Sequence, residues 1–308
     1  MRIFDLHCDT IYQCSKNGAN INRNSLEISL SKAKNLDTWI QCFAFWIPDD
    51  YRGDRAYQIF LQQHMYLKDQ IKRYPDSMSE YDMANPKSSC NAVLTVEGGA
   101  VLGGNIYNIR RLKEMGVSMM TLTWNAANEI AGGSECDRGF TQFGREVVLE
   151  MEQQGIIVDV SHLNSKSFWQ LSQFSKKPFV ATHSNSRRLC NHRRNLDDDQ
   201  IAVLIERGGL MGLNFHEDFL SKKEAGIPDV IAHAEHVLKI GGEKILAIGS
   251  DFDGARMPKD LKNIEYLEKL HKSMVQYFGE KITDDIFYQN AYDFFLGLKP
   301  DTNRGLNL

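Results

Sequence analysis

The chain has 308 residues, of which 42% are hydrophobic and 25% are charged, and this composition is typical of a soluble globular protein. A formal net charge of −4 excludes a broad basic surface for nucleic acid, and no apolar stretch is long enough to span a bilayer. Because the first residues enter an apolar strand directly, we expect no cleavable leader and a cytoplasmic protein. The six cysteines form no CxxC pair, which indicates reduced thiols.

Apolar runs of strand length alternate with helical patterns along nearly the whole chain, as in βα units around a parallel sheet. The predicted strands are residues 2–6, 38–46, 92–96, 117–123, 156–161, 178–182, 209–214 and 245–250. The predicted helices are residues 54–74, 107–115, 142–154, 198–208, 228–240, 258–278 and 283–296. Eight such units fit an α/β barrel. Because nothing in the sequence marks a linker, we expect a single domain over residues 1–308.

The first predicted strand leads into a pair of metal-type ligands, His7 and Asp9. Side chains two residues apart on a strand point to the same face, so the imidazole and the carboxylate can share one divalent ion. Both groups suit zinc. Cys8 between them turns to the opposite face, where we expect it to pack. Taken alone, the pair also fits a polar strand end.

Four later strands also end in a potential ligand or acid/base group. Glu97 precedes the glycine pair at 98–99, and His162, His183 and Asp251 each follow a short apolar run. Singly, these residues also fit helix caps or buried core histidines. In a parallel barrel, however, the carboxyl ends of all strands meet on the face that carries the active site. Together the residues predict a metal centre on that face.

Two polar loops belong to the same predicted face. Residues 125–144 form a glycine-bearing segment that is long for a βα connection, and such loops often shape a substrate pocket. Residues 184–195 carry four arginines directly after His183. Guanidinium groups bind carboxylates in a bidentate manner, so this loop suits an anionic substrate group, although a solvated basic loop is the alternative.

Seven short motifs give the chain a family resemblance. They are Asp-Leu-His-Cys-Asp-Thr (5–10), Val-Glu-Gly (96–98), Leu-Thr-Trp-Asn (122–125), Asp-Val-Ser-His (159–162), Thr-His-Ser-Asn (182–185), Arg-Arg-Asn-Leu-Asp-Asp (193–198) and Gly-Ser-Asp-Phe-Asp-Gly (249–254). In this order the sequence resembles the membrane dipeptidase (renal dipeptidase) family, the M19 metallopeptidases. Because we expect no leader, it looks like a bacterial-type member.

The resemblance implies a (β/α)8 TIM barrel of the metal-dependent hydrolase type that holds two zinc ions. The matching positions assign His7 and Asp9 to one ion, His162 and His183 to the other, and Glu97 to both. Asp251 matches the family's proton-transferring carboxylate. Arg194 matches the residue that binds the terminal carboxylate of the substrate.

Two positions depart from the pattern of the family. Trp124 stands where animal members carry a substrate-contacting histidine, and His216 stands where a tyrosine is often found. We expect both side chains to contact the substrate. The two differences bear on the substrate range more than on the chemistry.

The expected function is hydrolysis of dipeptides, including those with a D-residue at the C-terminal position, by water activated between two zinc ions. Another metal-dependent amidohydrolase or deacetylase acting on small amides is the nearest alternative, and a non-catalytic metal- or peptide-binding barrel is a third. The expected partner is a small dipeptide, not nucleic acid or a membrane. A homodimer stays an open alternative.

Overall fold

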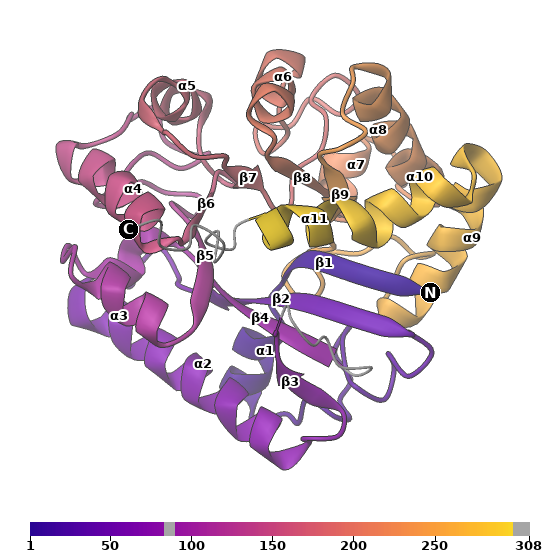
Figure 1. The fold of residues 1–308 in the computed structure, drawn as a ribbon, viewed down its shortest axis with the longest axis horizontal. Coiled ribbons are helices and arrows are strands. Elements are labelled where there is room, and N and C mark those ends of the chain that lie inside the picture. The colour runs from indigo at the N-terminus through magenta and orange to yellow at the C-terminus, as the bar shows by residue number, and fades with distance from the viewer. Residues whose placement is uncertain (83–89, 298–308) are drawn as a thin grey trace, which may run out of the picture.

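In the computed structural model, which describes residues 1–82 and 90–297, parallel strands close into a barrel surrounded by helices (Figure 1). The barrel strands are β1 (Arg2–Cys8), β2 (Thr38–Trp46), β4 (Cys90–Glu97), β5 (Val117–Thr121), β6 (Ile157–Asp159), β7 (Val180–Ala181), β8 (Leu210–Leu213) and β9 (Leu246–Ile248). They pair in this order, and β9 pairs with β1 to complete the ring. The (β/α)8 barrel expected from the sequence is confirmed.

The helices are α1 (Thr10–Asn17), α2 (Gly53–Arg73), α3 (Asn108–Glu114), α4 (Gln142–Gln154), α5 (Ser165–Phe174), α6 (Asp198–Arg207), α7 (Glu217–Leu220), α8 (Ile227–Lys239), α9 (Leu267–Phe278), α10 (Glu280–Asp284) and α11 (Asn290–Gly297). Short 3-10 turns form η1 (Gly99–Leu102) and η2 (Ile264–Tyr266), and a π-helical turn forms η3 (Asp285–Gln289). The sequence prediction missed the short helices α1, α5 and α7. It also missed β3 (Met78–Glu80), which pairs with the first residues of β4.

Strands β6 and β7 are shorter than the predicted ranges 156–161 and 178–182. The reason is the buried carboxylate of Asp159, whose Oδ1 accepts hydrogen bonds from the backbone N–H groups of Ser161 and Thr182, both at 3.0 Å. These N–H groups therefore bond to a side chain and not to a neighbouring strand. Side-chain hydrogen bonds thus hold the strand ends that lead to the candidate ligands.

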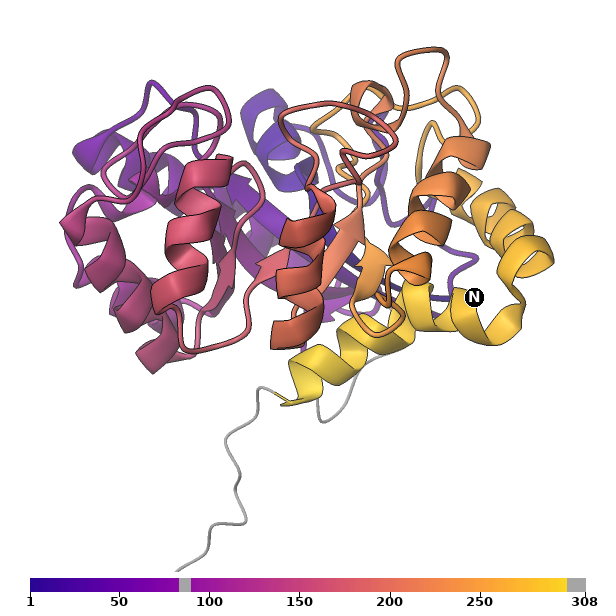
Figure 2. The same cartoon turned by 90° about the horizontal axis from the view of Figure 1, so that it is seen from above.

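One cluster of apolar side chains fills the inside of the barrel and includes Phe4, Leu6 and Val93. Helix α11 lies across one end of the barrel (Figure 2), where Phe295 contributes to the same cluster and its ring centroid lies 4.8 Å from that of Phe4. This end is therefore sealed by packed rings. The polar residues predicted to carry the chemistry lie at the carboxyl ends of the strands.

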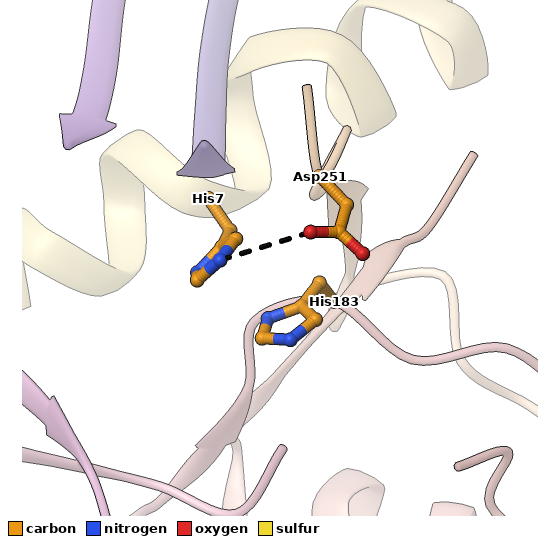
Figure 3. Close-up of side chains that lie close together, drawn as sticks. All are labelled: His7, His183 and Asp251. Atoms are coloured by element: carbon orange, nitrogen blue, oxygen red, sulfur yellow. Dashed lines mark ion pairs between the residues drawn. The ribbon is translucent and has the colours of Figure 1, made fainter. Parts of the chain in front are cut away.

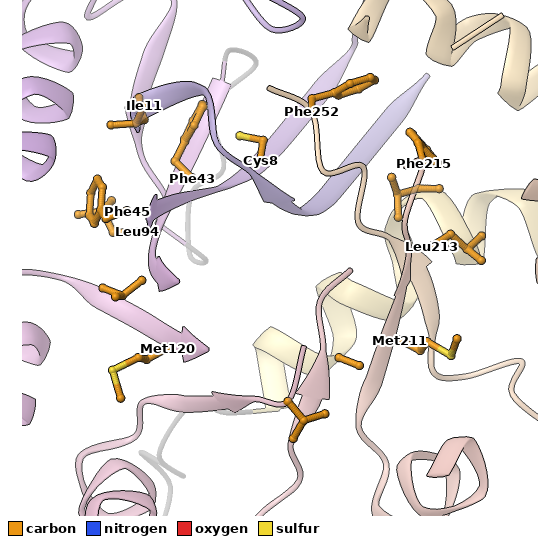
Figure 4. Close-up of a cluster of buried hydrophobic side chains, with 14 of the residues drawn as sticks. Cys8, Ile11, Phe43, Phe45, Leu94, Met120, Met211, Leu213, Phe215 and Phe252 are labelled. Carbon is orange, nitrogen blue, oxygen red and sulfur yellow. The ribbon is translucent and has the colours of Figure 1, made fainter. Parts of the chain in front are cut away.

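A second cluster packs between the outer face of the barrel and its helices (Figure 4). It includes Cys8, Phe43, Leu213 and Phe252, all fully buried. Burying a side chain the size of phenylalanine contributes about 1.5–3 kcal/mol, so this layer is a large part of the stability of the scaffold. The position of Cys8 in this layer confirms the expectation that it packs.

Candidate metal centre and substrate pocket

Six buried side chains converge at the carboxyl ends of the barrel strands. They are His7 at the end of β1 and Asp9 just after it, Glu97 at the end of β4, His162 after β6, His183 after β7 and Asp251 after β9. Figure 3 shows three of them, from β1 and the segments after β7 and β9, pointing toward one another. The structure thus brings together all the residues that the sequence predicts as ligands, with the predicted acid/base residue beside them.

A β-bulge in β1 turns the first two ligands toward the barrel axis. The register of β1 against β2 shifts between Asp5 and Cys8. Leu6 lies in the inner core and Cys8 in the outer core, so the faces of the strand exchange after Leu6. Without this exchange, the alternation that sends Leu6 inward would send His7 and Asp9 outward. Bulges beside active sites commonly re-aim a side chain in this way.

Glu97 occupies the middle of the cluster. Its Oε1 lies 2.9 Å from Nε2 of His162 and 3.4 Å from Nε2 of His183, and its Oε2 lies 3.8 Å from Nε2 of His7. Nε2 of His7 in turn lies 3.4 Å from Oδ2 of Asp9. Two sets of residues able to hold a metal ion therefore share Glu97, one with His7 and Asp9 and the other with the remaining two histidines.

The donor set fits divalent cations. Nε2 of His7 and of His183 are buried and have no hydrogen-bond partner in the described part of the chain, which is costly unless another group binds them. Burial lowers the pKa of His162 and His183, and neutral imidazole is the form that binds metal. Burial also raises the pKa of Glu97, and the nearby carboxylates Asp9 and Asp251 raise it further. A bound cation would stabilise the buried negative charge of these carboxylates.

Hydrogen bonds on the far side of the rings orient two of the histidines. Nδ1 of His162 lies 2.8 Å from Oδ1 of Asn125, and Nδ1 of His183 lies 2.8 Å from Oγ1 of Thr182. The Thr182 hydroxyl donates to the carboxylate of Asp159 at 2.7 Å, so its lone pairs face His183. In each case Nδ1 is the protonated nitrogen, which leaves the lone pair of Nε2 directed into the cluster.

Asp251 lies at the edge of the cluster with one oxygen held and the other facing the ligands. Nδ2 of Asn214 donates to its Oδ2 at 2.9 Å, while its Oδ1 lies 3.9 Å from Nε2 of His7. Burial raises the pKa of Asp251 to about 6. The backbone φ of Asp251 is 63°, a left-handed conformation that is uncommon for residues other than glycine. Such strained conformations cluster at functional sites.

Asp253, two residues further on, has a different environment. It accepts hydrogen bonds from the Thr10 hydroxyl at 2.5 Å and from the backbone N–H of Glu27 at 2.6 Å. These bonds join the turn after β9 to α1 and to the loop that follows α1. Asp253 therefore holds this turn in place through hydrogen bonds.

A cavity of about 470 Å³ opens over the cluster. The three predicted substrate-contacting residues, Trp124, Arg194 and His216, all line it. Arg194 is only 6% exposed; its Nη2 donates to the carbonyl of His183 at 3.2 Å, and its Nε has no partner in the described residues. Burial lowers the pKa of Arg194 to about 10, so the guanidinium is still charged at neutral pH. A buried cation with a free donor beside a cavity suits an anionic ligand.

Three residues that position the ligands and Asp251 have no role predicted from the sequence: Asn125, Thr182 and Asn214. Each is a polar residue at or just beyond the end of a predicted strand, and this placement is the signal that marked the ligands themselves. The partners of Asn125 and Asn214 lie in other strand–loop units, so only the folded structure pairs them, whereas Thr182 contacts the histidine next to it in the sequence.

Comparison with known proteins assigns the family. The family model for membrane dipeptidase, peptidase family M19, matches residues 1–292. The chain belongs to this family.

Three relatives illustrate the likeness of this M19 chain to known proteins. A metallopeptidase from Rhodobacter sphaeroides, crystallised with a phosphinate mimic of the dipeptide L-Ala-D-Ala, is 23% identical with a TM-score of 0.89, covering 97% of this chain and 98% of that one. Dipeptidase AC, another M19 metallopeptidase, is 24% identical with a TM-score of 0.89, covering 97% of both chains. An uncharacterized dipeptidase of Schizosaccharomyces pombe is 34% identical over 186 residues, which are 57% of this chain and 44% of that protein.

The family supports a metal-dependent peptide hydrolase, and the two solved structures support the barrel fold. Among the described residues, no helix combines the length and the apolar character needed to cross a membrane.

Proposed function

We propose that this M19 chain is a dipeptidase that uses two divalent metal ions, with zinc as the expected metal. His7 and Asp9 would hold one ion, His162 and His183 the other, and Glu97 both. The observation that carries the proposal is the shared position of Glu97, whose two oxygens lie within 3.8 Å of the Nε2 atoms of three buried histidines. Five ligands with one shared carboxylate exceed what a single tetrahedral ion with an open position requires.

When bound, the two ions would activate a water molecule and polarise the peptide carbonyl. Asp251 is the residue we assign to proton transfer, first accepting a proton from the attacking water and then delivering it to the leaving amine. Its Oδ1 faces the ligand cluster while Asn214 holds Oδ2, so the carboxylate has one fixed and one available oxygen. A group whose pKa is raised by burial is suited to exchange a proton near neutral pH.

Arg194 is the residue we assign to the free C-terminal carboxylate of the substrate. Its charge is buried and its Nε is unpaired in the described residues, so a carboxylate would both neutralise and satisfy it. A fixed carboxylate site beside the metal cluster limits how much peptide fits between them and favours dipeptides. The phosphinate mimic of L-Ala-D-Ala bound by the Rhodobacter sphaeroides relative supports this substrate class, including a D-residue at the C-terminal position.

A metal-reconstitution experiment tests the proposal. The apoprotein, prepared with a chelator and reloaded with zinc, should contain close to two equivalents by elemental analysis and should hydrolyse a panel of L,L- and L,D-dipeptides. Glu97→Gln should reduce the occupancy of both sites together. A stoichiometry of one would contradict the two-ion arrangement. Hydrolysis of acetylated amines with no activity on dipeptides would favour the amidohydrolase alternative.

A further inference from the structure

The cavity over the metal cluster has two chemically different sides. Arg194 and His216 belong to the segments that follow β7 and β8. Tyr12, Trp46 and Trp124 lie on α1, at the end of β2 and after β5. In both directions around the barrel, other strands separate β2 and β5 from β7 and β8. The two groups of side chains therefore face each other across the mouth of the barrel.

The side away from Arg194 is an aromatic wall formed by Tyr12, Trp46 and Trp124. The ring centroids of Trp46 and Trp124 are 5.0 Å apart at an interplanar angle of 67°, and those of Tyr12 and Trp46 are 4.6 Å apart at 86°. Such edge-to-face contacts hold each ring against its neighbour. Lys16 lies over the Tyr12 ring at 5.4 Å and does not line the cavity, whereas both indole side chains do.

Glu135 adds a carboxylate to the rim of this wall. Its backbone N–H donates to the carbonyl of Asn125 at 2.9 Å, and the hydroxyl of Ser134 donates to the side chain of Asn125 at 3.0 Å. These two bonds fasten the loop next to Trp124. The carboxylate itself is exposed and makes no ion pair within the described ranges, 1–82 and 90–297. Among the described residues, the lysines and arginines that line the cavity are Arg193 and Arg194, both in the segment after β7.

We propose that the aromatic wall and Glu135 bind the side chain of the substrate's N-terminal residue and select a cationic one, such as that of lysine or arginine. The inference rests on the proposed dipeptidase function, because Arg194 would hold the C-terminal carboxylate on the opposite side and so direct the N-terminal residue toward the wall. Indole faces attract cations through the negative face of the ring. At the rim of the wall, the carboxylate of Glu135 supplies a negative charge to pair with the cationic side chain.

Three matched side chains separate the contributions of shape and charge. Norleucine has nearly the length and apolar stem of lysine but no charge, so it can use only the packing surface of the wall. Glutamate brings a negative charge toward Glu135 and is disfavoured. Because Glu135 is exposed, its contribution is that of a screened ion pair, and together with the cation–π contact we expect about a fivefold preference for lysine over norleucine.

The test is a comparison of kcat/KM for Lys-Ala, norleucyl-Ala and Glu-Ala with the zinc-loaded enzyme. We expect Lys-Ala to be hydrolysed about fivefold more efficiently than norleucyl-Ala, and Glu-Ala least efficiently. In Glu135→Gln the ratio of Lys-Ala to norleucyl-Ala should fall by about half or more, and the ratio should fall further when Trp46→Leu is added. Glu206→Gln on α6, an exposed carboxylate far from the cavity, is the matched control and should leave the ratios as in the wild type.

The outcomes separate this inference from the proposed function. If no dipeptide is hydrolysed, the dipeptidase proposal fails. If dipeptides are hydrolysed but Lys-Ala and norleucyl-Ala are equal, the charge selection is wrong while the dipeptidase proposal stands. A loss of kcat/KM in Glu135→Gln that is the same for all three substrates would also overturn the inference, because it would assign Glu135 to support of the loop.

Discussion

The side-chain oxygen of Asn125 lies 2.8 Å from Nδ1 of His162 and also accepts a hydrogen bond from the hydroxyl of Ser134 at 3.0 Å. One amide therefore joins a candidate metal ligand to the loop that forms part of the substrate cavity. The bond keeps the proton of His162 on Nδ1 and its Nε2 lone pair toward Glu97.

Replacing Asn125 should weaken metal binding without removing a ligand. Asn125→Leu removes the acceptor, and loss of such an outer partner typically costs about 10- to 100-fold in metal affinity. Zinc affinity measured by competition with a chromophoric chelator should show this loss for one of the two ions. Asn125→Asp keeps an acceptor oxygen and serves as the control. Equal affinities for the wild type and Asn125→Leu would show that the ring is oriented by packing alone.

Asp251→Asn should separate chemistry from metal binding. The amide cannot accept and deliver the proton, so turnover of a dipeptide should fall by roughly 10²–10⁴-fold. Most of the zinc should be retained, since five other side chains form the proposed ligand set. Steady-state kinetics and elemental analysis on the same preparation check both parts. Activity within a few-fold of the wild type would make Asp251 a structural residue.

Arg194→Ala should mimic removal of the substrate's carboxylate. A charge-assisted contact is worth about 1.5–3 kcal/mol, so kcat/KM for a free dipeptide should fall about ten- to a hundredfold. The same dipeptide with an amidated C-terminus should already be a poor substrate of the wild type, and the variant should lower it little further. If the wild-type enzyme hydrolysed amidated and free dipeptides equally well, Arg194 would not be the carboxylate site.

Gly254→Ala should displace candidate metal ligands by a steric clash, without removing any of them. A Cβ atom at this position would lie 2.0 Å from Oδ2 of Asp9 and 2.8 Å from Oδ1 of Asp251, so both carboxylates would have to move. We expect at least about a tenfold loss of affinity for the ion that we assign to Asp9, measured by zinc titration. Gly297→Ala, where no other described residue lies within 4 Å of the added atom, is the control. Unchanged titrations in both variants would contradict the placement of Asp9 as a ligand.

The sequence by itself determined the order of the strands and the identity of the converging residues. Each strand and the polar residue that follows it can be recognised within about ten consecutive residues of the sequence. In a parallel barrel every such end faces the same side. His7, Glu97 and Asp251 could therefore be placed on one face without any knowledge of their contacts.

Only the tertiary structure decided how these side chains are aimed and supported. The alternation of β1 alone would place Leu6 and His7 on opposite faces, and the bulge against β2 brings both inward. The pairs Asn125–His162 and Asn214–Asp251 each join residues 37 positions apart, on different strand–loop units. Such contacts depend on how neighbouring strands are staggered, and this is set by the packing of the whole barrel, not by any local pattern.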